Sequence, residues 1–293
     1  MRSRAPSSIL LLAAFVLAGC GLSAPRIGGE MRPKFYRSAV SLAPGATEVV
    51  SMKAPHVRLM GTTTSCNYPP GLKGHKIAMK GMKPDYERIA EIKPELVVYD
   101  ADLTSEADVA KFKELGIETF GFRGKTVKEY IESLYRFGAL VGSETGISEY
   151  CDQILSAINQ ADAVGFDPKP KVAMLLPGSG SEHMIAGTRS FYADLLRSAG
   201  GHPVGPEADV FVALSAESLV SKDPDFVFVA GSRDPVLKDP RLASLQALKN
   251  ARVVQLNPDV ALRRGMRVNS LINEVRRFME ESLAARPVAT ARP

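Results

Sequence analysis

The residue types that most often carry enzymatic chemistry occur in this chain without the spacing that such chemistry needs. No two histidines have the His-Glu-x-x-His spacing that puts two metal ligands on one helix face. No Gly-x-Ser-x-Gly sequence exposes a nucleophilic serine, and the sequence Gly-Ser-Gly-Ser from Gly178 lacks the lysine of a phosphate-binding loop. The histidines are scattered, at His56, His75, His183 and His202. These patterns favour a binding protein over an enzyme.

Two glutamates stand at matching positions of a repeated stretch. Glu87 precedes Pro94 by seven positions, and Glu217 precedes Pro224 by the same seven. In both copies an acidic residue follows the proline, and an apolar run comes next. The repeat predicts two similar lobes.

Each copy of the repeat predicts a short helix, a break and a buried strand. Asp85 and Ser215 are good N-cap residues, which places the glutamates in the first helical turn, where the helix dipole favours an anion. Each proline ends its helix and restricts the preceding residue to extended conformations. The apolar runs at 96–99 and 226–229 predict strands covered on both faces. Two unrelated helix-to-strand turns would give similar signals, and the matched spacing favours a true repeat.

Predicted strands and helices alternate along the rest of the chain, as in doubly wound α/β proteins with a parallel sheet. Strands are expected at 37–42, 57–61, 117–122, 171–176 and 251–256, and helices at 44–52, 105–115, 127–141, 147–164, 240–248 and 266–283. The Gly/Pro-rich stretch 62–81 is expected to be a long loop, and such loops are usually functional or disordered.

The amino terminus has the features of a secretory signal peptide. Arg2 and Arg4 precede an apolar run at 9–17 that is too short to span a membrane as an ordinary helix. The run ends in Leu-Ala-Gly-Cys at Cys20, which resembles the lipobox of bacterial lipoproteins. We therefore expect a signal peptide at 1–19, lipidation of Cys20 and a tether at 20–35, with the chain anchored outside the cytoplasm of a bacterium.

Charge and cysteine content set further limits. The full chain has a formal net charge of +5, and removal of the two signal-peptide arginines leaves +3, too little to argue for a nucleic-acid partner. Cys66 and Cys151 lie in different parts of the chain, so a disulfide between them is possible and unsupported. No metal site or cofactor is expected.

Several motifs are similar to those of the solute-binding proteins of ABC importers, in the class that carries vitamin B12, iron siderophores and haem. These motifs are Ser41-Leu-Ala-Pro-Gly-Ala-Thr-Glu48, Asn67-Tyr-Pro-Pro70, Gly81-Met-Lys-Pro-Asp-Tyr-Glu-Arg-Ile89, Lys93-Pro-Glu-Leu-Val-Val98 and Gly187-Thr-Arg-Ser-Phe191 ahead of Ala199-Gly-Gly201. The resemblance covers about residues 36–283 and implies a monomer of two doubly wound α/β lobes, joined by a single long linker helix, with a ligand cleft between the lobes. It divides the chain into an N-terminal lobe at 36–141, a linker helix at 142–165, a C-terminal lobe at 166–285 and a disordered tail at 286–293.

The resemblance also implies roles for particular residues. By their position in the repeat, Glu87 and Glu217 match the exposed glutamates that dock into arginine pockets of the ABC permease. The alternative for these residues is a simple helix-start role. The expected ligand is a metal chelate, and the chain lacks tryptophan that could stack on a corrin. Ser65, Met79, Asp100 and Phe211 match the family's cleft positions.

Two modes of ligand binding are open. A flat macrocycle can pack on Met79 and Phe211, because thioethers and aromatic rings are polarisable. An anionic siderophore or the propionates of haem can instead pair with basic side chains. The basic candidates are Lys80, Arg123, Arg263 and Arg264. Tyr68 and Tyr192 complete the expected ligand contacts. These two tyrosines, Met184 and His183 are the candidate ligands of haem iron, and ordinary packing is the alternative for each of them. An exported enzyme or a sensing lipoprotein on the same scaffold is the alternative function.

Overall fold

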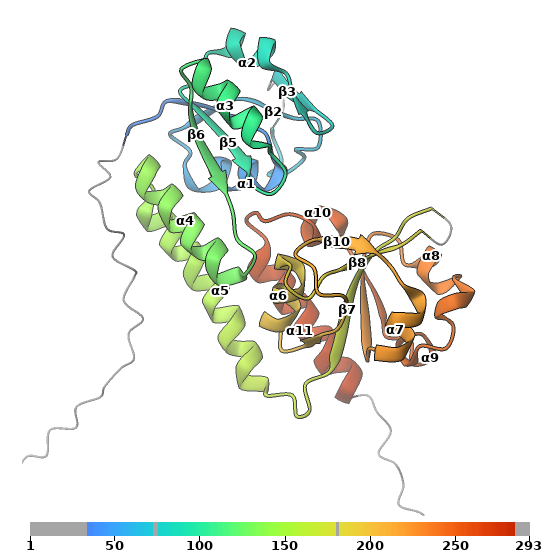
Figure 1. The fold of residues 1–293 in the computed structure, drawn as a ribbon. Coiled ribbons are helices and arrows are strands. Elements are labelled where there is room, and N and C mark those ends of the chain that lie inside the picture. Colours follow the sequence, from blue (N-terminus) through green and yellow to red (C-terminus); the bar gives the residue numbers. More distant parts are fainter. Residues whose placement is uncertain (1–33, 73–75, 180–181, 285–293) are drawn as a thin grey trace, which may run out of the picture. The chain divides into compact units, whose positions relative to one another are not determined.

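The computed structural model describes residues 34–72, 76–179 and 182–284, apart from the side chain of Lys80. Its first half forms a six-stranded sheet in the order β4-β3-β2-β1-β5-β6 (Figure 1). The strands are β1 Ser38–Ser41, β2 Arg58–Thr63, β3 Lys76–Lys80, β4 Lys83–Pro84, β5 Leu96–Asp100 and β6 Glu118–Phe122. All neighbours pair in parallel except β3 and β4, so the predicted parallel sheet is confirmed, with one short antiparallel strand at its edge.

The second half forms a similar sheet in the order β10-β8-β7-β11-β12, with β9 paired to β7. The strands are β7 Lys171–Leu176, β8 Met184–Ala186, β9 His202–Pro203, β10 Phe211–Ala213, β11 Phe226–Ala230 and β12 Val253–Leu256. Its parallel centre was predicted, whereas the antiparallel strands β8 and β10 were not. These strands have three residues each and carry too little periodic signal to be recognised.

Helices connect the strands of each sheet. In the first half they are α1 Pro44–Lys53, α2 Tyr86–Ile92, α3 Glu106–Glu114 and α4 Val127–Val141. In the second half they are α6 Phe191–Ser198, α7 Ala216–Lys222, α8 Asp234–Leu237, α9 Gln246–Lys249, α10 Pro258–Ala261 and α11 Val268–Ala284, with a 3₁₀ turn at Pro240–Leu242. The single helix expected at 240–248 is thus two short pieces, because Leu245, with a ψ of 134°, leaves the helical conformation between them.

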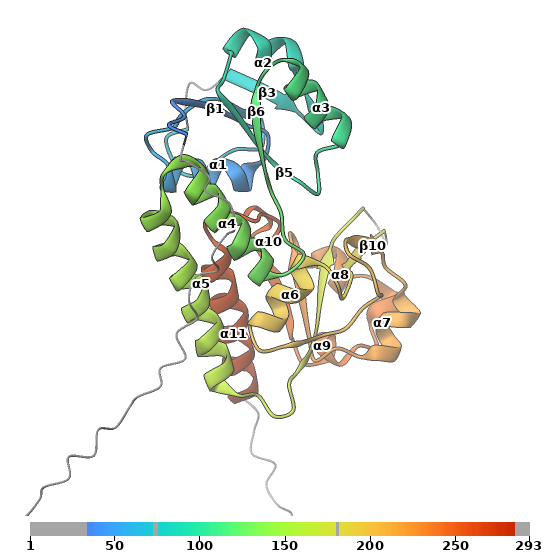
Figure 2. The same ribbon diagram turned by 60° about the vertical axis from the view of Figure 1, so that its left-hand side comes forward.

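The long helix α5 Glu144–Val164 lies between the two sheets in the sequence. It packs along α4 on one side and α11 on the other (Figure 2). One continuous apolar core, from Tyr36 to Met279, includes buried residues of both halves and of these three helices. Smaller cores cover the other face of each sheet.

The two copies of the repeat have the same local structure. Asp85 and Ser215 accept hydrogen bonds from the backbone N–H of Arg88 and Ser218, as predicted for N-caps. The first-turn positions of Glu87 and Glu217 are confirmed, and both side chains are exposed.

The residue before each proline differs from the prediction. Lys93 and Asp223 have φ values of 52° and 40°, which is the left-handed region and not an extended conformation. Both act as C-caps, and this conformation lets their N–H groups bond to the last turn of α2 and α7. The acid after each proline also has one role in both copies. The carboxylates of Glu95 and Asp225 accept from the backbone N–H at the start of the neighbouring strand, at 2.5 and 2.8 Å.

The expected loop at 62–81 is partly a strand. β2 continues to Thr63, and β3 pairs with β2 in parallel and with β4 in the opposite direction. β3 was not recognised because its two ends are lysines and its apolar run is short. Within the described ranges, no helix is both long enough and apolar enough to cross a membrane.

Candidate functional site

The segment 263–267, between α10 and α11, carries three arginines and is held in place by its backbone. We call it the arginine segment. The hydroxyl of Tyr130 in α4 donates to the carbonyls of Arg264 and Gly265, at 3.1 and 3.2 Å. The hydroxyl of Tyr150 in α5 donates to the Gly265 carbonyl at 2.7 Å and accepts from the N–H of Val268 at 3.1 Å. Two buried tyrosines therefore fix the segment against the long helices.

Arg264 binds the carboxyl end of the first sheet. Its guanidinium donates to Asp100, to Asp102 at 2.5 Å and to the carbonyl of Gly124 at 2.8 Å. The Arg264 side chain is only 7% exposed, and it lies over the ring of Phe191 at 5.8 Å. Burial raises the pKa of the Asp100 carboxyl, and the attraction of Arg264 opposes this rise. Arg264 is thus fully occupied by protein groups.

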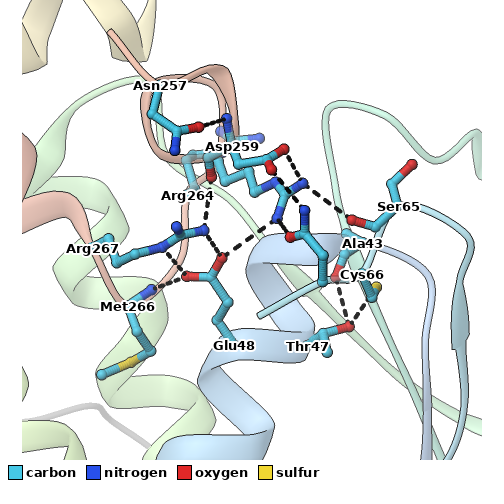
Figure 3. Close-up of polar contacts among 12 residues, drawn as sticks. Ala43, Thr47, Glu48, Ser65, Cys66, Asn257, Asp259, Arg264, Met266 and Arg267 are labelled. Atoms are coloured by element: carbon cyan, nitrogen blue, oxygen red, sulfur yellow. Dashed lines mark hydrogen bonds and ion pairs between the residues drawn. The ribbon is translucent and has the colours of Figure 1, made fainter. Parts of the chain in front are cut away.

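Glu48 in α1 binds the other end of the arginine segment. Its side chain is 1% exposed and accepts from the N–H of Met266 at 3.0 Å and from Arg267 at 2.5 Å. Figure 3 shows the contacts of the Glu48 carboxylate with both partners. The guanidinium of Arg267 also lies 4.4 Å from the centre of the Tyr68 ring. Tyr68 was expected to contact a ligand, and in this structure its ring packs against the guanidinium of Arg267.

Arg263 joins the loop after β2 to α10. It donates to the side chain of Asn67 at 2.6 Å, to the carbonyl of Ser65 at 3.1 Å and to Asp259 (Figure 3). Asn67 in turn donates to Asp259 at 2.6 Å. The Ser65 side chain itself is exposed. Like Arg264, Arg263 is already paired with an acid.

Two glycines permit the close approach of the arginine segment to α1. A Cβ atom at Gly45 would lie 2.3 Å from the carbonyl oxygen of Arg264, and one at Gly265 would lie 2.4 Å from a carboxylate oxygen of Glu48. Such distances are shorter than real atoms allow. The backbone contact therefore requires glycine at Gly45, and the buried carboxylate of Glu48 leaves no room for a side chain at Gly265.

An aromatic pair lies beside the Arg264 cluster. The rings of Tyr192 and Phe211 are 4.8 Å apart at 47°, and the Tyr192 hydroxyl donates to the carbonyl of Leu262 at 3.3 Å. Burial raises the pKa of Tyr192, and its nearest charges are Arg264, Asp100 and Asp102. Two of the expected ligand contacts, Tyr192 and Phe211, are thus brought together.

Met79 lies away from this pair. It is 7% exposed and belongs to the apolar core of the first sheet, together with Val40, Ile89 and Val97. It therefore offers a ligand little surface. The side chain of Lys80 and the whole of Cys20 fall outside the described residues.

A hollow of about 840 Å³ opens beside Asp102, at the ends of β5 and β6 and between α3 and α4. Its volume is within the range of small-molecule sites. Arg123 lines it. The other charged lining residues are Asp102, Glu106, Lys113, Lys125, Glu129, Glu132 and Arg136. The Lys125 ammonium also pairs with Asp209, near Phe211, at 2.6 Å.

Sequence reasoning named Asp100 as a site residue but missed the other three acids that pair with the arginines. Glu48 ends the motif that begins at Ser41, but its partner Arg267 is 219 residues away. Asp102 and Asp259 gave no signal, since neither belongs to a recognised spacing. No group of three or more His, Cys, Asp or Glu residues that could hold a metal ion occurs in the part of the chain that the structure describes.

Comparison with known proteins identifies the fold and the family. The chain is 22% identical over 299 residues to an uncharacterised ABC transporter substrate-binding lipoprotein, YvrC, of Bacillus subtilis, covering 91% of this chain and 93% of YvrC. It is 24% identical over 200 residues to the vitamin B12-binding protein of Salmonella typhi, covering 68% and 74%. The crystal structure of the periplasmic haem-binding protein HutB of Vibrio cholerae has a TM-score of 0.73 at 18% identity, covering 83% of this chain and 98% of HutB. A family model described as periplasmic binding protein matches residues 40–260. The chain therefore belongs to the periplasmic binding protein family.

Proposed function

We propose that this chain is a lipid-anchored, extracytoplasmic solute-binding protein that captures a metal chelate and delivers it to an ABC importer. The match to the family over residues 40–260 supports the binding role. The similarity to an ABC transporter substrate-binding lipoprotein over 91% of the chain supports both the importer and the anchor. The sequence Leu-Ala-Gly-Cys at Cys20 supplies the lipidation site.

The observation that carries this proposal is the equivalence of Glu87 and Glu217. Each lies in the first turn of a short helix, two positions after a capped N-terminus, and each is exposed. First-turn acids also occur in other helices, such as α3 and α4, where the helix dipole favours them. Glu87 and Glu217 differ from these acids in that they occupy the same position in the two copies of the repeat. Two matched anions suit a partner that has two matched cationic pockets, because long-range attraction speeds association between charged surfaces.

The ligand is proposed to be a cobalamin-like corrinoid, a ferric siderophore or haem. Relatives named for vitamin B12 and haem support this class. Tyr192 and Phe211 offer ring surface for a flat chelate, next to the hollow beside Asp102. The chain would bind and release this ligand without covalent chemistry. Because α5 packs along both α4 and α11, we expect small movements between the halves on binding.

The test is uptake with and without the two glutamates. In cells that depend on this protein for uptake of one chelate, Glu87→Ala/Glu217→Ala should lower uptake by at least about tenfold while the purified variant keeps its Kd for that chelate. The matched control is Glu91→Ala/Glu149→Ala, which removes two exposed helix acids outside the repeat position and away from the hollow. Normal uptake by the first variant would contradict the docking role.

A further inference from the structure

The charges around the expected ligand contacts do not favour the anion-binding mode, which is one of the two modes that the sequence left open. In that mode Arg263 and Arg264 pair with an anionic ligand, but both donate to carboxylates of this chain. Arg267 is likewise paired with Glu48. Three guanidiniums thus face four carboxylates: Glu48, Asp100, Asp102 and Asp259.

Two of these carboxylates, Asp102 and Asp259, are more accessible than the arginines with which they pair. The side chains of Arg264 and Arg263 are 7% and 11% exposed, whereas those of Asp102 and Asp259 are 49% and 41% exposed. Asp102 lines the 840 Å³ hollow, and Asp259 lies beside the loop of Ser65 and Asn67. A ligand in this region therefore meets carboxylate oxygens, with the guanidiniums behind them.

An anionic ligand could reach Arg264 only by displacing Asp100 or Asp102. Asp100 is largely buried, so loss of its partner would leave a buried carboxylate uncompensated, which is strongly unfavourable. The remaining charges of the hollow do not reverse this balance. Lys125 is paired with Asp209, which is not among the lining residues. Lys113, Arg123 and Arg136 are matched in number by Glu106, Glu129 and Glu132.

We propose that Asp102 and Asp259 are specificity-determining residues that favour chelates with outer hydrogen-bond donors, such as amide N–H, hydroxyl or ammonium groups, and reject chelates with outer carboxylates. Carboxylate oxygens accept from such donors and repel a second carboxylate. This inference rests on the proposed function and narrows its ligand class.

The test uses pairs of chelates in which the second member carries outer carboxylates where the first carries amide, ammonium or ester groups. The pairs are dicyanocobinamide and dicyanocobyrinic acid, ferrioxamine B and its N-succinyl derivative, and haem dimethyl ester and haem. Dissociation constants are measured with the full-length mature chain by titration. In the pair that binds, we expect the member without the added carboxylates to bind at least about tenfold more tightly, a difference of about 1.4 kcal/mol.

Two further experiments test whether the carboxylates of Asp102 and Asp259 cause this preference. Asp102→Asn/Asp259→Asn should reduce the ratio of the two dissociation constants towards one, whereas Asp162→Asn, an exposed change in α5, should leave it unchanged. In the unmodified chain, added salt should improve binding of the carboxylated member, because it screens the repulsion. The salt experiment gives a result even if the double variant does not fold.

Each outcome decides between the proposals. Equal or tighter binding of the carboxylated member would overturn the inference and leave the proposed function intact. If Arg123→Gln then lost this binding, Arg123 would be identified as the residue that binds the carboxylate. If no pair binds, the proposed function fails and this inference fails with it.

Discussion

A carboxylate oxygen of Glu48 lies 2.5 Å from a guanidinium nitrogen of Arg267, although the two residues are 219 positions apart in the sequence. Glu48 follows the first strand of one sheet, and Arg267 precedes the last helix that packs on α5. The pair is enclosed, since the Glu48 side chain is 1% exposed. It ties the beginning of the fold to its end.

Removal of this carboxylate should be costly. Glu48→Ala leaves Arg267 and the N–H of Met266 without their acceptor in a buried position. We expect a loss of about 3–5 kcal/mol in the free energy of unfolding, measured by urea denaturation. The matched control is Glu114→Ala, which breaks an exposed pair with Lys111 in α3 and should cost less than about 1 kcal/mol. Equal losses of unfolding free energy in the two variants would show that the buried pair contributes no more to stability than the exposed one.

The backbone contact between α1 and the arginine segment leads to a second prediction. Gly45→Ala and Gly265→Ala each force a methyl group against an atom closer than 2.5 Å, so each should destabilise the chain by about 1–3 kcal/mol.

Gly146→Ala provides the opposite control for this glycine prediction. Gly146 lies in α5, and the nearest atom to an added Cβ there is 3.7 Å away. In a helix, alanine in place of glycine should stabilise by about 0.5–1 kcal/mol. Thermal unfolding of the three variants checks both signs, and a stabilising Gly45→Ala would contradict the contact described here.

The elements of the repeat could be predicted because their signals are local. The N-caps Asp85 and Ser215, the prolines and the apolar runs act on neighbours a few residues away, and the structure confirms the helices and strands that they predict. The predicted extended conformation of the residue before each proline was wrong. Lys93 and Asp223 adopt the left-handed conformation instead, because it lets their N–H groups bond to the last helical turn.

The charge state of the candidate site could not be predicted, because it depends on contacts between distant residues. A pattern of basic residues indicates an anion site only if no acid of the same chain reaches them. Arg264 meets Asp100 and Asp102 after a separation of more than 160 residues, through the docking of one segment on the ends of β5 and β6. The residues that neighbour Arg264 in the sequence give no indication of this pairing.

Cys151 should be nearly unreactive in the folded chain. Burial in α5 raises its pKa from 9.0 to about 12. The fraction of thiolate at pH 8, and with it the rate of alkylation, should fall by about a thousandfold relative to the unfolded chain. Mass spectrometry of a Cys20→Ser/Cys66→Ser chain, in which Cys151 is the remaining thiol, measures this rate with iodoacetamide.

The same raised pKa predicts how the stability of the fold depends on pH. The folded state holds the Cys151 proton more tightly than the unfolded state, so its contribution to stability is fully present below pH 9 and is lost as the pH rises from 9 towards 12. Cys151→Ala should remove this part of the alkaline loss. Rapid alkylation of native Cys151 at pH 8 would show that the thiol is not buried in solution.

The proposed lipid anchor would depend on one atom, the sulfur of Cys20. Cys20→Ser removes the nucleophile that receives the lipid while leaving the signal peptide unchanged. Since stable anchoring needs more than one acyl chain, we expect the variant to lose the detergent-phase partitioning and the added lipid mass of the unmodified protein. Cys66→Ser is the matched control and should partition like the unmodified chain, because Cys66 lies inside the fold beside Thr47 and Thr63. Unaltered detergent partitioning of Cys20→Ser would mean that another segment holds the protein at the membrane, and the lipid-anchored part of the proposed function would then be withdrawn while the ligand-binding part stands.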